Sequence, residues 1–107
     1  MFEFIETPFF TKALDRYLDD DEYVELQTRL NKHPDSGKVV PGSGGVRKLR
    51  WSAEGRGKRG GLRVVYCLRL ARGQIWMLTL YGKNVLADIP AHVLKEMKEA
   101  IENAKDD

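Results

Sequence analysis

A chain of 107 residues, 42% hydrophobic and 32% charged, has the balance of one soluble domain, and we expect a single domain over residues 1–107. No apolar run approaches the roughly 18–20 residues that cross a bilayer, which argues against a membrane-spanning helix. The first residues carry no basic segment and no cleavage site of a signal peptide, so we expect a cytoplasmic protein.

The positive charge is concentrated in one stretch, from Arg47 to Arg63. It holds seven Lys and Arg residues and one acid, Glu54, so its net charge is +6. The other residues hold 11 Lys and Arg against 15 Asp and Glu, a net charge of −4, and the whole chain is +2. A basic segment in an otherwise acidic domain indicates a site for a polyanion, of which nucleic acid is the commonest.

The N-terminal part predicts a strand followed by two helices. Phe2–Ile5 is a short apolar run typical of a strand, and Thr7 precedes Pro8–Leu18 as the cap of a first helix. The acids Asp19–Glu22 favour the N-terminus of a second helix, which should end near Lys32 before a proline. Because few residues separate the two helices, we expect an antiparallel helical hairpin.

The middle of the chain predicts three strands. A loop rich in Gly and Pro covers residues 35–45, and Val46–Ser52 follows as a strand. Ala53–Gly61 is a basic, glycine-rich loop without the pattern of a phosphate-binding P-loop. Leu62–Leu70 and Ile75–Tyr81 form a hairpin, and since both are apolar on both faces they belong in the middle of the sheet.

A last helix completes the predicted order β-α-α-β-β-β-α. Asp88 is expected to cap it, with Pro90 in its first turn and an apolar stripe through Leu94, Met97 and Ile101. The predicted class is therefore α+β, with a mostly antiparallel sheet and the helices packed on one face. The uncovered face would present the ends of the central strands and the basic loop.

Few kinds of catalysis suit the remaining polar residues. The single Cys67 lies in an apolar run, which indicates buried packing, and His33 and His92 belong to separate helices. The sequence has no Cys and His residues at the spacing of a zinc site and no pair of carboxylates near the central strands. We therefore expect no metal and no cofactor. What remains is a set of Lys and Arg on strands and a loop, together with Trp51, Tyr66 and Tyr81.

Such a set fits the cleavage of RNA, which carries its own nucleophile in the 2′-hydroxyl. Attack on the adjacent phosphate needs alignment, stabilisation of negative charge and proton transfer. Arginine binds phosphate oxygens bidentately, and aromatic rings stack on unpaired bases. Neighbouring cations disfavour the ammonium form of a lysine, which lets it act more readily as a base at neutral pH. The same residues also fit an RNA-binding module without catalysis, and composition alone leaves both interpretations open.

Three motifs resemble one family, the RelE superfamily of toxins, in its HigB-like branch. They are G-x-G-G-V-R-K-L-R-W at 42–51, G-R-G-K-R-G-G-L-R-V-V-Y at 55–66 and L-T-L-Y-G-K-N at 78–84. The resemblance implies the RelE-like fold and the toxin of a type II toxin–antitoxin module, which cleaves mRNA in the ribosomal A site. It also implies a cognate antitoxin, a HigA-like helix-turn-helix protein, as a partner.

The resemblance also implies which residues form the site. The arginine that opens the third strand falls on Arg63, at the scissile phosphate, and Lys83 and Lys58 would serve in proton transfer or charge stabilisation. The residues that would hold RNA are Lys48, Arg50, Arg56, Arg59, Arg47 and Tyr81. Asn84 replaces an arginine of the RelE pattern, and no aromatic residue follows Tyr81 to match the C-terminal tyrosine of RelE.

Two other functions are compatible with the same residues. A ParE-like relative would poison DNA gyrase with this fold, and an RNA-binding module would bind RNA in a salt-sensitive way without cutting it. An antitoxin would cover the basic face or separate the strand ends from the loop, and the sequence leaves that choice open.

Overall fold

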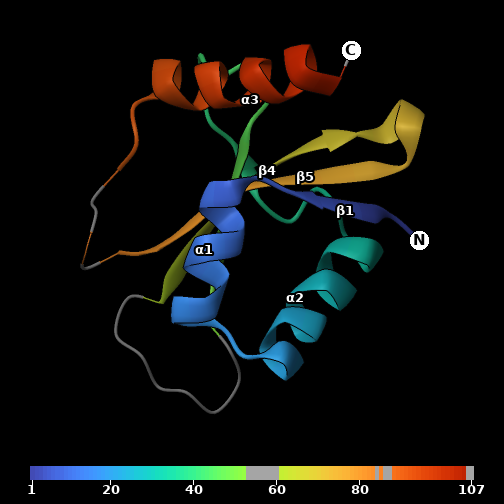
Figure 1. The fold of residues 1–107 in the computed structure, drawn as a ribbon, viewed down its shortest axis with the longest axis vertical. Coiled ribbons are helices and arrows are strands. Elements are labelled where there is room, and N and C mark those ends of the chain that lie inside the picture. The colour runs from blue at the N-terminus through green and yellow to red at the C-terminus, as the bar shows by residue number, and fades with distance from the viewer. Residues whose placement is uncertain (53–60, 84, 86–87, 106–107) are drawn as a thin grey trace.

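A computed structural model describes residues 1–52, 61–83, 85 and 88–105 (Figure 1). The elements are β1 (Glu3–Glu6), α1 (Pro8–Tyr17), α2 (Asp20–Lys32), β2 (Lys38–Val39), β3 (Arg47–Trp51), β4 (Leu62–Arg69), the 3-10 turn η1 (Leu70–Arg72), β5 (Gln74–Gly82) and α3 (Ala91–Lys105). The strands form one sheet in the order β1-β5-β4-β3-β2, in which β1 is parallel to β5 and the other pairs are antiparallel. The predicted α+β class and mostly antiparallel sheet are confirmed. Within the described ranges, no helix has the length and apolar character needed to span a bilayer.

The starts of α1 and α2 follow from their capping residues, as predicted. The Thr7 hydroxyl accepts a hydrogen bond from the Phe10 amide at 3.0 Å, and Pro8 is the first helical residue. Asp19 and Glu22 form a reciprocal capping box, in which each backbone amide donates to the other side chain at 2.8 Å. Such caps satisfy N–H groups that a helix leaves unpaired at its N-terminus, each contributing about 1 kcal/mol.

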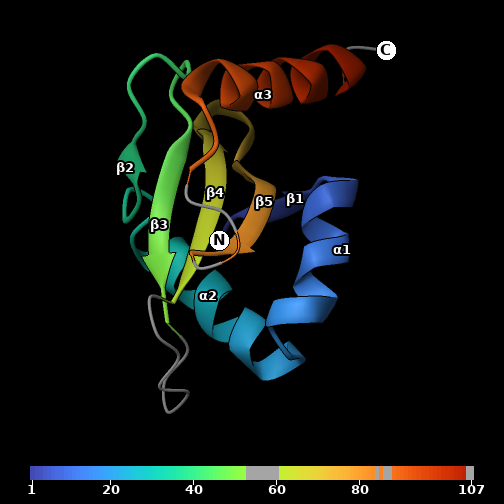
Figure 2. The same ribbon diagram turned by 90° about the vertical axis from the view of Figure 1, so that its left-hand side faces the viewer.

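The sheet is packed on both faces, so the expectation that all helices share one face is wrong for α3. On one face, α1 and α2 bury a cluster made of Phe10, Leu18, Leu26, Leu30, Leu49, Leu62, Val64, Tyr66, Ile75, Met77 and Leu80. On the other, Leu94 of α3 packs with Val46, Val65, Cys67, Trp76, Leu78 and Tyr81. Because alternate residues of β4 and β5 are apolar on both faces, one helical layer cannot bury them. Figure 2 shows α3 lying across one end of the strands, apart from α1 and α2.

A β-bulge decides which residues of β5 face α3. The register of β4 and β5 shifts between Val65 and Tyr66, which leaves Leu78 as an extra residue in β5. Met77 therefore faces α1 and α2, whereas Tyr81 faces the side of α3 although both positions are odd. Strict alternation along β5 would have placed both on the same face.

Two details differ from the prediction. The expected loop at 35–45 contains the short strand β2, which pairs with β3 at the edge of the sheet. The final helix begins at Ala91, where the Pro90 carbonyl accepts the amides of Val93 and Leu94 at 3.0 and 3.2 Å. Asp88, the expected cap, instead pairs with Lys48, a residue 40 positions earlier. Local sequence cannot reveal that competing partner.

Candidate nucleic-acid site

A row of three polar side chains crosses the face of the sheet on which α3 packs. In the register of the sheet Arg50 lies opposite Arg63, and Arg63 lies opposite Tyr81. Directly opposite residues of antiparallel strands share a face, with Cβ atoms about 5 Å apart. Lys48 lies on this face too, two pairs further along and opposite Val65. Three strands thus bring separate parts of the sequence to one place.

Residues of β2, β3 and β4, with Lys83 just after β5, line a cavity of about 510 Å³. Five of its lining residues are cations: Lys38, Lys48, Arg50, Arg63 and Lys83. The other lining residues in the described part of the chain are uncharged: Ser36, Val39, Val40, Pro41 and Leu49. A concave site with one sign of charge and low-dielectric walls raises the local concentration of anions. The structure therefore brings four of the predicted residues together and adds Lys38, which only the pairing of β2 with β3 places there.

Arg63 is the most buried of the five cations, with 8% of its surface exposed. Its Nη1 atom donates to the Leu62 carbonyl at 3.3 Å, and the side chain lines the cavity. A guanidinium stays charged at any physiological pH, and its attraction for an anion is stronger where water is partly excluded. Arg63 is therefore well placed to bind a phosphate oxygen.

Among the described residues, Asp88 is the acid that pairs with a cation of this cavity, and its partner is Lys48. Its ammonium group donates to the Asp88 carboxylate, whose side chain is 71% exposed against 30% for Lys48. This hydrogen bond and the charge of Lys48 lower the pKa of Asp88, and Arg63 lowers it further. Asp88 is thus an ionised carboxylate beside two cations of the site.

Tyr81, opposite Arg63, has only 6% of its surface exposed. Its hydroxyl is buried and has no hydrogen-bond partner among the residues that the structure describes. Burial raises the pKa of Tyr81, while Lys48 and Arg63 oppose that shift and Asp88 adds to it. The phenol therefore stays protonated at neutral pH and remains a hydrogen-bond donor.

Arg47 does not join the group. It lies opposite Tyr66, which belongs to the other face of the sheet, and its Nη1 donates to the Gly37 carbonyl at 2.7 Å. The Tyr66 hydroxyl donates to the Pro34 carbonyl at 2.7 Å and accepts the Gly37 amide at 2.8 Å. These contacts anchor the segment before β2, and so position Lys38 from behind the sheet.

Other predicted residues stand apart from the described site. Trp51 is half-buried and packs against the core on the side of α1 and α2. Lys58, Arg56 and Arg59 lie outside the described residues, as does Asn84. His33 ends α2 as its C-cap, and His92 is an exposed residue of α3.

The chemistry of the described side chains offers no set of metal ligands. Across residues 1–52, 61–83, 85 and 88–105, no three His, Cys, Asp or Glu side chains gather where they could hold a metal ion. Cys67 is buried, and that burial raises the pKa of its thiol from 9.0 to about 11, so it is protonated and unreactive at neutral pH. The prediction that Cys67 serves packing is confirmed.

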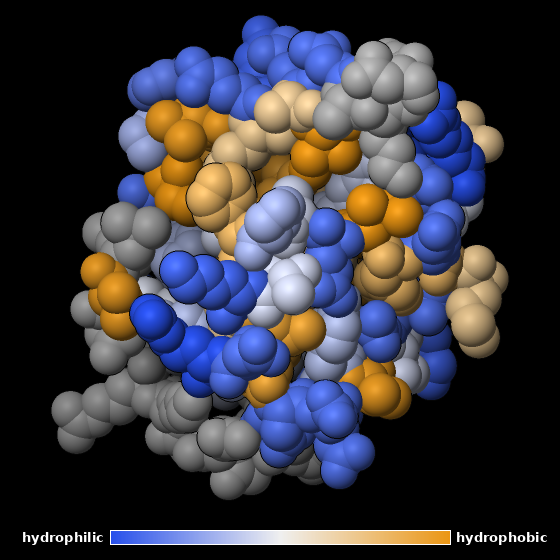
Figure 3. Space-filling model, in the orientation of Figure 1, coloured by the Kyte–Doolittle hydropathy of each residue, from blue (hydrophilic) through white to orange (hydrophobic). Residues whose placement is uncertain are grey.

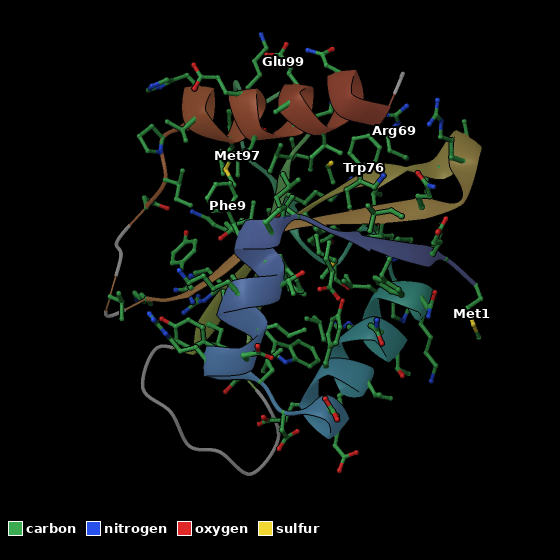
Figure 4. All side chains as sticks on the ribbon, in the orientation of Figure 1. Met1, Phe9, Arg69, Trp76, Met97 and Glu99 are labelled. Carbon is green, nitrogen blue, oxygen red and sulfur yellow. The ribbon has the colours of Figure 1, made fainter. Side chains whose placement is uncertain are left out.

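A second hollow, of about 330 Å³, is apolar. It is lined by Ile5, Glu6, Thr7, Pro8, Phe9, Met97, Ala100 and Ile101, between β1, the start of α1 and α3. Figure 3 shows hydrophobic surface below α3 in this region, and Figure 4 shows Phe9 and Met97 close together there. None of these lining residues is a cation, so this hollow does not favour a phosphate.

Comparison with known proteins places the fold. No family model matches the chain. A solved structure of the E. coli toxin RelE, a double arginine-to-alanine variant in the free state, superposes with a TM-score of 0.60 at 10% sequence identity. The match covers 91% of this chain and 96% of that one. This chain has a RelE-like fold, as predicted. At so low an identity the likeness shows the fold alone, and the function has to be argued from the site.

Proposed function

We propose that this protein is the toxin of a type II toxin–antitoxin module, of the HigB-like branch, and that it cleaves mRNA in the ribosomal A site. The observation that carries the proposal is the convergence of Lys48, Arg50, Arg63 and Lys83 on one cavity. It occurs in a fold shared with the E. coli toxin RelE. Cations from β3, β4 and the segment after β5 can contact one phosphodiester.

The proposed reaction is a transesterification within RNA. The 2′-oxygen attacks the adjacent phosphorus, the bond from phosphorus to the 5′-oxygen breaks, and a 2′,3′-cyclic phosphate and a 5′-hydroxyl form. The proton of the 2′-hydroxyl passes to a base, and the departing 5′-oxygen takes a proton from an acid. DNA lacks the attacking hydroxyl, so the reaction selects RNA.

We assign this work to the cations of the site and to Lys58, which lies outside the described residues. Arg63 contacts a non-bridging phosphate oxygen and stabilises the charge that grows in the transition state. Lys83, an exposed cation of the cavity, stabilises the same negative charge or takes part in proton transfer, together with Lys58. Lys48 and Arg50 hold the flanking RNA backbone, and Lys38 extends this surface along the sheet edge.

The partners follow from the same proposal. The toxin acts on mRNA held by the ribosome, and a HigA-like helix-turn-helix antitoxin silences it. An antitoxin that covers the cationic cavity would block RNA directly. The protein works in the cytoplasm, where both partners are made.

The decisive experiment compares induction of the wild type, Arg63→Ala and Arg72→Ala in bacteria. Arg72 is an exposed cation at the far end of the β4–β5 hairpin, so its variant removes the same charge away from the site. We expect growth arrest from the wild type and Arg72→Ala, and none from Arg63→Ala. Equal arrest by all three would contradict the assignment of Arg63.

Primer extension on mRNA after induction then tests the reaction. Codon-phased cuts that vanish in Arg63→Ala support an mRNA nuclease. DNA damage with intact mRNA would identify a gyrase poison instead. Binding of ribosomal mRNA without any cut would identify a non-catalytic RNA-binding module.

A further inference from the structure

The most informative unexplained contact in the site is the one between Lys48 and Asp88. Lys48 lines the cationic cavity, and its ammonium group is held by a carboxylate from the segment that leads into α3. Asp88 is largely exposed, so no burial requirement forces it onto Lys48. An exposed ion pair of this kind contributes little to folding, which leaves its position in the site to be explained.

The surroundings of Asp88 resemble those that a phosphate requires. A carboxylate and a phosphodiester each carry one negative charge and present two terminal oxygens. Asp88 contacts Lys48 and lies close enough to Arg63 and Tyr81 for the charges of these groups to act on one another. One cation thus contacts this anion and a second acts on it through its charge, and a phosphodiester can replace it by contacting both cations at once.

The Tyr81 hydroxyl supplies the second observation. It is buried, protonated and without a hydrogen-bond partner among the described residues, on the same side of the sheet as Arg63. An unpaired buried donor carries an energetic cost that an incoming acceptor can remove. Its ring packs with the core on the side of α3, which argues against its stacking on a base and leaves the hydroxyl as the functional group.

We propose that the Asp88 carboxylate competes with an RNA phosphodiester for Lys48, and that the Tyr81 hydroxyl, which Asp88 leaves without a partner among the described residues, donates to the phosphodiester once Asp88 is displaced. Lys48 exchanges one anion for the other. Asp88 is a competitor of the substrate, and Tyr81 is a positioning donor for it. The inference rests on the proposed function only in taking RNA as the ligand.

The opposite role for Asp88 is that of a general base, and the two roles make opposite predictions. If Asp88 competes with RNA, it weakens the affinity for RNA, so its removal tightens the complex. A base leaves affinity nearly unchanged and its removal slows cleavage. The suitable probe is therefore a short single-stranded RNA with methylated 2′-hydroxyls, which binds but cannot be cut.

The first test measures the affinity of this probe for Asp88→Asn by fluorescence anisotropy at fixed low salt. We expect it to bind about tenfold more tightly than to the wild type, because one carboxylate no longer competes for Lys48. Asp15→Asn, on the exposed side of α1, is the matched control for the loss of one negative charge and should change affinity less than about twofold. Equal gains from both variants would overturn the inference.

A double-mutant cycle locates the effect. In a Lys48→Met background Asp88→Asn should no longer tighten the complex, because the contested cation is gone. An undiminished gain in that background would overturn the proposal. So would the absence of measurable RNA binding by every variant.

Tyr81→Phe tests the hydroxyl. We expect the probe to bind about tenfold more weakly, while the melting temperature stays the same or rises, because the variant removes a buried polar atom without a partner. A hydroxyl with a purely structural role would give the reverse pattern, with lower stability and unchanged affinity. All three tests use an uncleavable RNA, so they stand whether or not the nuclease assay succeeds.

Discussion

The two ends of one sheet face have opposite characters. Under α3, Cys67 of β4 pairs with Trp76 of β5, and both are buried in an apolar cluster. At the other end of the same two strands, Arg63 pairs with Tyr81 and faces a cationic cavity. The difference teaches that one pair of strands serves as core where a helix covers it and as a site where none does.

This arrangement also explains how a small domain holds like charges together. Arg50 and Arg63 lie directly opposite each other, a pairing that destabilises a sheet. The covered end anchors β4 and β5 firmly enough to keep that pairing. The strands that position the site are thus stabilised by packing at their other end, under α3.

The largest expected effect is a loss of stability caused by a substitution at the end of the strands that α3 covers. Trp76→Ala should lower the free energy of unfolding by about 3–5 kcal/mol, because it empties a fully buried position and removes the ring beneath Arg69. Urea denaturation followed by circular dichroism measures this. Arg50→Ala, at the open end, is the comparison and should change the free energy of unfolding by less than about 0.5 kcal/mol.

Next in size is the catalytic effect at the open end. If the proposed function holds, Arg63→Ala should slow cleavage of ribosome-bound mRNA by about 10²–10³-fold, since it removes the buried cation to which we assign stabilisation of the transition state. The assay is single-turnover cleavage with excess toxin. A rate within threefold of the wild type, from a variant shown to be folded, would contradict the role given to Arg63.

The two ends should also differ in their response to alkaline pH. Burial raises the pKa of Cys67 from 9.0 to about 11, so the folded state keeps this proton when the unfolded chain has lost it. The protonated thiol therefore stabilises the fold fully below pH 9. As the pH rises to about 11, the free energy of unfolding falls by about 2–3 kcal/mol on this account. Denaturant midpoints between pH 8 and 11 measure this, and Cys67→Ala should show a shallower decline. Parallel declines would show that other groups cause it.

The smallest expected effect concerns the attachment of α3. The Arg69 guanidinium lies 4.5 Å from the centre of the Trp76 ring and donates a hydrogen bond to the Glu102 carboxylate of α3 at 3.2 Å. Figure 4 labels Arg69 and Trp76 beside each other. Arg69→Ala should lower stability by about 1 kcal/mol, because both contacts are partly exposed. Thermal melts against Arg72→Ala, which lacks such contacts among the described residues, test it. An equal melting temperature for both variants would show that Arg69 does not anchor α3.

Much of the fold was predictable because its signals are local. Thr7 and Asp19 mark their helices through bonds that span three residues, and the double-sided apolar runs of β4 and β5 identify central strands. The side of α3 was not predictable in this way. Its apolar stripe needs a partner, but nothing in the stripe says which face of the sheet provides it.

The sequence by itself determined the helix starts, the central hairpin and the concentration of positive charge, since these depend on residues that are neighbours in the chain. Only the tertiary structure decided that Tyr81 turns toward Arg63, because a bulge shifts the register of β5. It also decided that Asp88 reaches Lys48 and that Lys38 joins the cavity. Such contacts join distant segments, and their free energy depends on the packing of the whole domain.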